Sequence, residues 1–323
     1  MRDEEFVLSI DVGGTKILVG AVDVGGHILW EKHFPMRNDD ADTIEMSVMT
    51  AIDDMLASLK VRPMGVGMGL VGSVNSKDGI WNGAINIPLS RPVKIAERIW
   101  EKHRLHARID NDVHAAALAE ARLGAYSTSE LALYINIGTG ISSAIFSQGR
   151  VMHGVGNYAG EMGHMVVGGP DHICKCGRRG CIEPFVSGGG LVDRMRELVQ
   201  LHKECILSTR TEQRDFSAGE IFEAACNGDH TALELVEISH RLLVCATVNI
   251  VNFINPEWIV LGGGALDTPW ICRDFERLVR REVLPVSEKS LKGIRISSLD
   301  PKKVGLLGAG CIYYEYLAKG RNK

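Results

Sequence analysis

Hydrophobic and polar positions follow one strand pattern at two places along the chain. Residues 6–30 (FVLSIDVGGTKILVGAVDVGGHILW) and 131–153 (LALYINIGTGISSAIFSQGRVMH) each hold two apolar runs joined by a glycine- and threonine-containing turn. A short glycine-containing turn and the start of a third strand follow in both. Such runs and turns predict β-hairpins. Their recurrence predicts two duplicated α/β units that open with the same three strands.

Individual residues also correspond between the two repeats. A polar residue recurs near the end of the first strand, and glycines recur where the turns form. The corresponding pairs are Asp11 with Asn136, Gly13 with Gly138 and, after a two-residue shift, Gly26 with Gly149.

Two segments between these repeats predict helices. Residues 112–125 (DVHAAALAEARLGA) are rich in alanine, and we expect this helix to begin at Asp112 as its N-cap and to stop at Gly124. Residues 42–59 place their apolar side chains on one face. The residues on that face are Ile44, Val48, Ile52, Met55 and Leu59.

The second half of the chain contains two further helical patterns. Residues 239–256 are apolar over a long stretch, which predicts a helix buried on most sides. This helix leads into a strand, EWIVLGGG, that ends in a glycine cluster. The last helix, from Gly308 onward, is expected to cross back to the first domain. We expect the polar segment 208–217 to be the most flexible loop.

Length and composition limit the function classes. A chain of 323 residues predicts two domains, and 45% hydrophobic with 24% charged residues is typical of a globular protein. The net charge of −4 and the lack of a basic block argue against a nucleic-acid partner. The start, MRDEEFVLSID, does not resemble a secretory signal, and no apolar run is long enough to span a bilayer. We therefore expect a cytoplasmic protein with reduced thiols.

The cysteines fall into two groups in this reducing setting. Three of them, Cys174, Cys176 and Cys181, lie close together in HICKCGRRGCIEPF, and three thiolates suit tetrahedral zinc. A fourth ligand is then needed, and the candidates are His172 inside the run and His164 upstream; we favour His164 because His172 would crowd the loop. The scattered cysteines, expected to be small buried side chains, are Cys205, Cys226, Cys245, Cys272 and Cys311.

Three glycine-containing turns have the residues of a nucleotide site. In the first, backbone N–H groups can point at an anion, and an aspartate can hold hydrated Mg²⁺. Tight hairpin geometry alone would also explain each turn, but two in duplicated positions and a third favour phosphate and adenosine binding. None is a Walker A motif. The candidate residues are Asp11, Gly13, Gly14, Thr15, Lys16, then Gly138, Thr139, Gly140, and finally Gly262, Gly263 and Gly264.

Five motifs, taken in order, resemble the ROK family of sugar kinases and sugar-sensing repressors. They are IDVGGTK, DND at 110–112, INIGTG, GEMGH at 160–164 and CKCGRRGCIE at 174–183. The resemblance implies an actin-like (ribonuclease H-like), duplicated α/β fold with a ligand cleft between two domains, and a homodimer. Residues 1–112 with 306–323 would form the smaller domain, and 113–305 the larger, zinc-binding one. The implied zinc ligands are His164, Cys174, Cys176 and Cys181.

The resemblance also implies a reaction, the ATP- and Mg²⁺-dependent phosphorylation of the 6-hydroxyl of an aldohexose such as glucose. Asp112 matches the general base of the family, although a plain helix N-cap would also explain it. A zinc-bound histidine has a fixed ring and keeps one ring nitrogen for a sugar hydroxyl, so the zinc would serve to order the sugar site. The implied sugar-contacting residues are Asn86, Asn111, Asp112, Glu161, His164 and Glu183.

The chain departs from the family pattern at three places, which leaves the sugar open. Val71-Gly72 replaces Pro-Gly, Ile141-Ser142-Ser143 replaces extra glycines, and His114 replaces an asparagine; we expect His114 to pack or bond locally. N-acetylglucosamine, N-acetylmannosamine, allose and fructose are alternative substrates. A sugar-responsive repressor without its DNA-binding domain is the alternative of another class. The resemblance disfavours it, because the repressors of the family carry a helix-turn-helix before the first strand, where only ten residues precede Asp11 here, and tend to lose the phosphate turn that this chain keeps.

Overall fold

The structure, a computed structural model, divides into two compact units. The first unit comprises residues 1–129, 146–159 and 298–323, and the second comprises 130–145 and 160–297. The residues described are 5–37, 40–84, 87, 89–124, 126, 129–168, 172–202, 204–208, 216–264 and 274–320.

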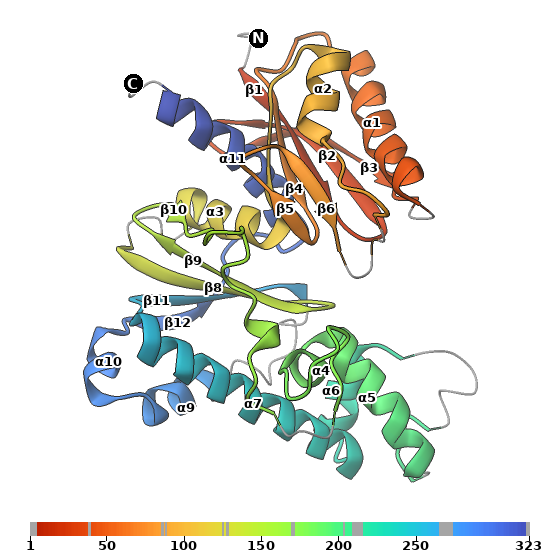
Figure 1. Cartoon of the computed structure of the whole chain (residues 1–323). Coiled ribbons are helices and arrows are strands. Elements are labelled where there is room, and N and C mark those ends of the chain that lie inside the picture. Colours follow the sequence, from red (N-terminus) through yellow and green to blue (C-terminus); the bar gives the residue numbers. More distant parts are fainter. Residues whose placement is uncertain are drawn as a thin grey trace. The chain divides into compact units, whose positions relative to one another are not determined.

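The first five-stranded sheet has the order β3-β2-β1-β4-β7 (Figure 1). Strands β1 (Phe6–Val12), β2 (Lys16–Asp23) and β3 (Ile28–Pro35) are antiparallel, as the predicted hairpins require. Strands β4 (Val66–Leu70) and β7 (Ala107–Asn111) continue the sheet parallel to β1. A small separate hairpin pairs β5 with β6, Ser73–Asn75 with Ile80–Gly83.

The second five-stranded sheet repeats this arrangement in the order β10-β9-β8-β11-β12. Strands β8 (Leu131–Ile137), β9 (Ile141–Ser147) and β10 (Arg150–Val151) follow one another along the chain. Strand β11 (Trp258–Gly262) pairs in parallel with β8 on one side and with β12 (Gly293–Ile296) on the other. The predicted duplication is confirmed, because the two sheets have the same strand order relative to their first strand.

The residue correspondences are confirmed as well. Asp11 and Asn136 are each the sixth of seven residues in the first strand of their sheet. Gly26 and Gly149 lie in the second hairpin turn of each repeat with φ values of 83° and 73°, the left-handed region that glycine adopts without strain.

Helices cover both faces of the first sheet. Alternate residues of β4 separate the faces: its apolar side chains join the core formed by α1 (Ala41–Ser58) and α2 (Ile95–His103). Its glycines, at Gly67 and Gly69, face α11 (Val304–Gly320) and α3 (Asp112–Leu123). The absence of side chains on that face lets these two helices approach closely.

The contact between α3 and α11 gives a stability prediction. A Cβ at Gly308 would lie 2.0 Å from the backbone oxygen of Ala115. Because the two backbones would have to part, Gly308→Ala should lower the free energy of unfolding by about 1–3 kcal/mol. Gly219→Ala is the matched control, since its Cβ would meet only ordinary contacts, and should raise stability by about 0.5–1 kcal/mol. Urea titrations followed by circular dichroism compare them; equal effects would contradict the close approach.

Helices of the second unit pack around the apolar side chains of β8 and β11. A short 3₁₀ helix, η1 (Met162–His164), precedes them. The α-helices are α4 (Glu183–Val186), α5 (Gly188–Leu201), α6 (Ala218–Cys226), α7 (His230–Ile254), α9 (Phe275–Glu282) and α10 (Pro285–Ser290).

Several predicted helices needed correction. Helix α7 begins at His230, not near residue 239, because Asp229 caps it through a hydrogen bond to the N–H of Ala232. It is not buried on most sides, since Phe253 is 89% exposed. Helix α11 begins at Val304, four residues before the predicted start, and packs on the first sheet as expected. Helix α1 has the predicted apolar face, except that Leu59 is its C-cap.

The compact units divide the chain at other points than the sequence predicted. Helix α3 belongs to the first unit, because Ala115 packs against Gly69 of β4 and against α11. Residues 146–159 and 298–305 also belong to the first unit.

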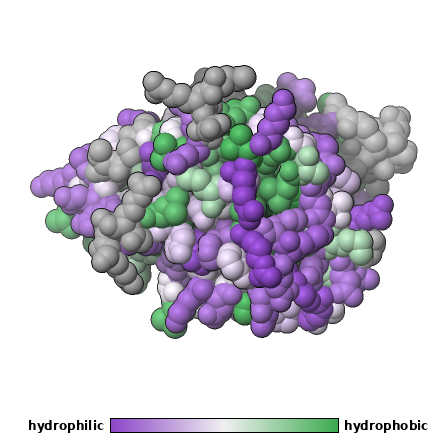
Figure 2. Space-filling view, turned by 90° about the horizontal axis from the view of Figure 1, so that it is seen from above, coloured by the Kyte–Doolittle hydropathy of each residue, from purple (hydrophilic) through white to green (hydrophobic). Residues whose placement is uncertain are grey.

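Hydrophilic side chains cover much of the surface seen in Figure 2, with hydrophobic ones between them, as on most globular proteins. Among the residues that the structure describes, no helix has the length and apolar character needed to cross a membrane.

Candidate active site and metal centre

The candidate base Asp112 is the first residue of α3, directly after β7. The sequence predicted it as the N-cap, but the cap is Asn111, whose Oδ1 accepts hydrogen bonds from the N–H groups of Val113 and His114. The Nδ2 of Asn111 donates to the carbonyl of Gly72 at 2.8 Å. Asn111 therefore fixes the start of α3, and the Asp112 carboxylate is not needed as a cap.

A second carboxylate, Asp11 near the end of β1, lies close to Asp112 in the first unit. Gly69 lies between them: its Cβ position is 3.7 Å from the Cα of Asp112 and 3.9 Å from Oδ1 of Asp11. Gly305 in the first turn of α11 also gives Asp11 room, because a Cβ there would be 2.4 Å from Oδ2. Glycines on two elements thus make space for one acidic pair.

Both carboxyl groups have raised pKa values. Burial raises the pKa of Asp11 to about 6. Burial and the neighbouring charge of Asp11 raise the pKa of Asp112 to about 7, although the N–H of Val113 acts in the opposite direction. A carboxylate with this pKa can both accept and release a proton near neutral pH.

The raised pKa of Asp112 predicts a pH-dependent effect on stability. The unfolded group titrates near 3.8 and the folded one near 7, so ionisation of Asp112 in the folded chain costs stability increasingly as the pH rises between these values. Asp112→Asn carries no charge and should raise the melting temperature more at pH 8 than at pH 5. Calorimetry without magnesium or nucleotide measures this, with Asp54→Asn as an exposed control. A shift independent of pH would contradict the raised pKa.

The first predicted phosphate turn is a tight hairpin connection between β1 and β2. The N–H of Gly13 donates to the carbonyl of Lys16, and the carbonyl of Thr15 accepts from Met36. Thr15 and Lys16 are exposed, and Gly14 lies between them and Gly13. The turn thus leaves the Thr15 and Lys16 side chains accessible to a ligand.

The second turn also has an internal hydrogen bond, but it is one residue shorter: the N–H of Gly138 donates to the carbonyl of Gly140. Its outer carbonyls, of Gly138 and Thr139, accept from the N–H groups of Gly188 and Gly189 at the start of α5. The glycine run 188–190 was missed by the sequence reasoning, although the letters SGGG before a helix could have signalled it. Cβ atoms at these glycines would press on backbone oxygens at 2.5–3.0 Å.

The third turn has a packing role in the part that is described. A Cβ at Gly262 would lie 2.1 Å from the hydroxyl of Tyr134, and one at Gly263 would lie 2.3 Å from the carbonyl of Ile137. These two glycines are therefore required by the close approach of β11 to β8. Gly264 has open space around its Cβ position.

Three predicted sugar-binding residues gather around η1 in the second unit. Glu161 precedes η1 and His164 ends it, and Nε2 of His164 is 4.0 Å from a carboxylate oxygen of Glu161. Glu183, the first residue of α4, has its Cβ 3.3 Å from the Cβ position of Gly163. The carboxylate of Glu183 faces the second turn, 3.5 Å from the N–H of Ile141.

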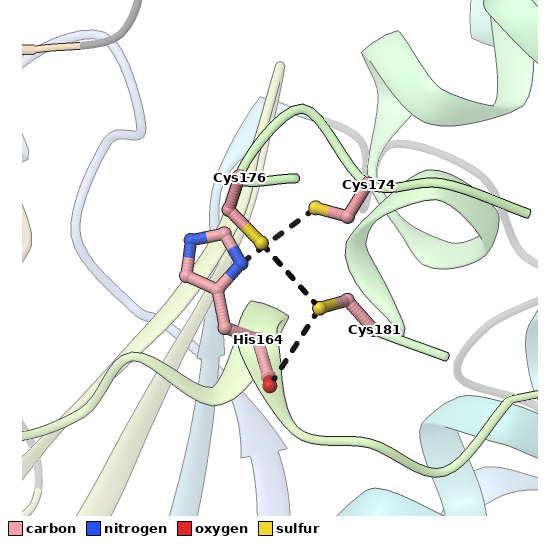
Figure 3. A group of neighbouring side chains, drawn as sticks. All are labelled: His164, Cys174, Cys176 and Cys181. Atoms are coloured by element: carbon pink, nitrogen blue, oxygen red, sulfur yellow. Dashed lines mark hydrogen bonds between the residues drawn. The ribbon is translucent and has the colours of Figure 1, made fainter. Parts of the chain in front are cut away.

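The histidine and three cysteines form one cluster in the second unit (Figure 3). Sγ of Cys174 is 3.7 Å from Nδ1 of His164, and Sγ of Cys176 is 3.7 Å from Sγ of Cys181. Two sulfurs bound to one tetrahedral zinc at about 2.3 Å lie about 3.8 Å apart. The spacing of the four side chains therefore fits a zinc ion, with Nδ1 of His164 as its nitrogen ligand.

The alternative ligand, His172, lies elsewhere. Its Nδ1 is 3.3 Å from Arg194, and its ring contacts Phe185 edge-on. The structure thus groups His164, not His172, with the cysteines.

One of the three thiols is already acidic. The backbone N–H of Arg178 beside Cys176 lowers the pKa of that thiol to about 6, so that a thiolate is available at neutral pH.

Four of the five scattered cysteines lie in the described part of the chain. Cys205 and Cys311 are buried as predicted, whereas Cys226 and Cys245 are exposed. Three predictions fall outside the described residues: those for Asn86, for Cys272 and for most of the segment 208–217.

Comparison with known proteins gives a family for the whole chain. The model of the ROK family matches residues 7–315. The chain is 33% identical over 273 residues to a glucokinase of Halalkalibacterium halodurans, which covers 82% of this chain and 81% of that protein. It is also 29% identical over 290 residues to an N-acetyl-D-glucosamine kinase of Escherichia coli, covering 86% and 90%.

Solved structures agree with this assignment. A ROK family transcriptional regulator, a homolog of the E. coli MLC protein, gives a TM-score of 0.84 at 26% identity, covering 96% of this chain and 78% of that one. A ROK family glucokinase from Streptomyces griseus in complex with glucose and AMPPNP gives 0.73 at 26% identity, covering 94% and 98%. The expected actin-like α/β fold is confirmed. Because the match runs from the first strand into the last helix, the chain belongs to the ROK family.

Proposed function

We propose that this chain is an ATP-dependent sugar kinase that phosphorylates the 6-hydroxyl of an aldohexose such as glucose. The observation that carries the proposal is the placement of Asp112 at the first turn of α3, capped by Asn111, beside Asp11 and with a pKa of about 7. A general base is most effective when its pKa lies near the working pH.

In the proposed reaction, Asp112 accepts the proton of the sugar hydroxyl while that oxygen bonds to the γ-phosphorus of ATP and ADP leaves. A positioned base contributes about 10²–10⁴ in rate. Most of the remaining acceleration in phosphoryl transfer comes from positioning and from neutralised phosphate charge. Asp112 is therefore one part of a site that also has to hold the triphosphate.

Each repeat offers groups that could bind the phosphates or their metal. The Asp11 carboxylate suits hydrated Mg²⁺, which neutralises phosphate charge when bound. The turn 13–16, with the Lys16 ammonium, and the turn 138–140, with the Thr139 hydroxyl, would contact phosphate oxygens. Residues 262–264 would line the adenosine side.

Sugar recognition would rest on the residues around η1. The free Nε2 of His164, together with Glu161 and Glu183, would bind sugar hydroxyls, with Asn86 and Asn111 as further predicted contacts. Zinc held by His164 and the cysteine loop would order this segment, because a metal-bound histidine has a fixed ring orientation. The His164–Glu161 distance of 4.0 Å supports a shared role.

Two alternatives rest on specific likenesses. The N-acetyl-D-glucosamine kinase relative, at 29% identity, supports the same chemistry on an N-acylhexosamine, and allose and fructose remain within that chemistry. The likeness to a transcriptional regulator, at a TM-score of 0.84, supports a sugar-responsive repressor. The acidic pair Asp11 and Asp112 favours the kinase, since a repressor that only binds sugar has no use for a base with a pKa of about 7.

A substrate panel tests the proposal. The purified chain is incubated with ATP, Mg²⁺ and each of glucose, mannose, allose, fructose, N-acetylglucosamine and N-acetylmannosamine, and ADP release is followed by a coupled assay. Glucose should give the highest kcat/KM. A higher value for an N-acylhexosamine would change the substrate alone, and sugar binding without ADP release would favour the repressor. Light scattering tests the homodimer that the family resemblance implies.

A further inference from the structure

Two histidines and one aspartate form a largely buried cluster beside the proposed base, and the cluster has no part in the proposed reaction. Asp110 is at the end of β7, His114 is in the first turn of α3, and His153 follows β10. All three belong to the first unit. Asp110 and His114 are buried, and the His153 side chain is 35% exposed.

Both oxygens of Asp110 face an imidazole nitrogen. Nδ1 of His114 is 3.1 Å from Oδ1, and Nε2 of His153 is 2.5 Å from Oδ2. The two rings meet edge to face with centroids 5.0 Å apart. One carboxylate oxygen and one nitrogen from each ring lie within 4.8 Å of one another.

The hydrogen bonding of His114 raises a specific problem for a neutral ring. Its Nε2 is 3.1 Å from the carbonyl oxygen of Ala159, which can only accept, so Nε2 carries a proton. In the neutral ring, Nδ1 then presents a lone pair to the carboxylate of Asp110, and two acceptors would face each other. A cation has to lie between them, either a second ring proton or a metal ion.

The surroundings match a metal site in three respects. A histidine ligand commonly donates its other N–H to a backbone carbonyl, as His114 does to Ala159. The carboxylate ligand is itself held in place, here by the N–H of Asn111 at 2.8 Å and by Nδ2 of Asn157 at 3.2 Å. Two histidines and a carboxylate are a common ligand set for zinc and other divalent transition metals.

The distances also suit a metal after a small adjustment. Two ligands of one zinc, at about 2.0–2.1 Å from it, lie about 3.3 Å apart. The His114–Asp110 separation of 3.1 Å is already close to this value, and the 2.5 Å contact of His153 would lengthen. The partial exposure of His153 lets water reach the site and complete the coordination.

We propose that Asp110, His114 and His153 form a second metal site for a divalent transition-metal ion, separate from the cysteine cluster. Such an ion would connect the first turn of α3 to residues 153–159. It would thereby be a third interaction that fixes the start of α3, in addition to the Asn111 cap and the packing of α11.

Metal counting tests this proposal without any kinase assay. The purified chain is dialysed against Zn²⁺ and freed of excess metal by gel filtration. The zinc bound per chain is then measured by inductively coupled plasma mass spectrometry. We expect two equivalents in the unchanged chain and one each in His114→Asn, His153→Asn and Cys176→Ser. His27→Asn is the matched control, because it removes an exposed histidine–aspartate pair, and should keep two.

Cobalt identifies which site is lost. Co²⁺ bound by thiolates gives a strong near-ultraviolet charge-transfer band, which His153→Asn should retain at one equivalent. Circular dichroism checks folding, and His153→Asn decides the outcome if the more buried His114→Asn does not fold. Equal metal content in the unchanged chain and in a folded His153→Asn variant would overturn the proposal and leave a proton-held His114. Loss of kinase activity alone has no bearing on it.

Discussion

Asp112→Asn should lower kcat for sugar phosphorylation by at least about a hundredfold while sugar binding stays measurable. The amide keeps the shape of the side chain but cannot accept the hydroxyl proton. The Asn111 cap, which does not involve Asp112, should hold α3 in place in the variant. Steady-state kinetics give kcat, and isothermal titration calorimetry gives the dissociation constant for the sugar.

The control for this experiment is a carboxylate of equal size outside the site. Asp54 lies in α1, and Asp54→Asn removes its exposed ion pair with Lys32, which should leave kcat and sugar affinity unchanged. Turnover of Asp112→Asn at the unchanged rate would remove Asp112 from its proposed role. Loss of both turnover and sugar binding would indicate a positioning role instead.

Cys176→Ser should lose both the zinc of the cysteine cluster and sugar affinity. Three of four ligands would remain, but the metal would no longer close the loop that carries Cys174, Cys176 and Cys181, and His164 would lose its fixed orientation. We expect the dissociation constant for the sugar to rise by about tenfold or more. Elemental analysis measures the zinc, and calorimetry measures the sugar.

Cys226→Ser is the matched control for the cysteine variant. Cys226 is an exposed cysteine at the end of α6, outside the metal cluster, and its replacement should leave zinc content and sugar affinity unchanged. A Cys176→Ser chain that had lost the zinc of the cysteine cluster and still bound sugar normally would contradict the supporting role of that zinc. It would leave the base assignment of Asp112 intact.

The strands and their duplication could be predicted because their signals are local. Apolar runs and glycine turns at Gly26 and Gly149 carry the hairpin pattern within a few residues. The faces of helices were harder to predict, because hydropathy does not say which side meets a neighbour. Phe253 in α7 is an example, because it is exposed although its segment is apolar. The start of α7 at His230 was missed because its first turns carry polar residues around the Asp229 cap.

The cysteine cluster was predictable for a similar reason: three of its four ligands lie within eight residues. The contacts of Gly188 and Gly189 with the second turn were not, since they depend on how α5 returns to β8. The Asp110–His153 contact joins residues 43 positions apart, and no spacing in the sequence indicates it. His114 could be named as a departure from the family pattern, but its partners came only from the folded chain.

A crystal structure of this chain with glucose and a non-hydrolysable ATP analogue would test the central claim most directly. The account predicts a carboxylate oxygen of Asp112 within about 3.2 Å of the sugar 6-hydroxyl, the reach of a general base. A bound sugar whose hydroxyl groups all lie beyond hydrogen-bonding distance of Asp112 would contradict it.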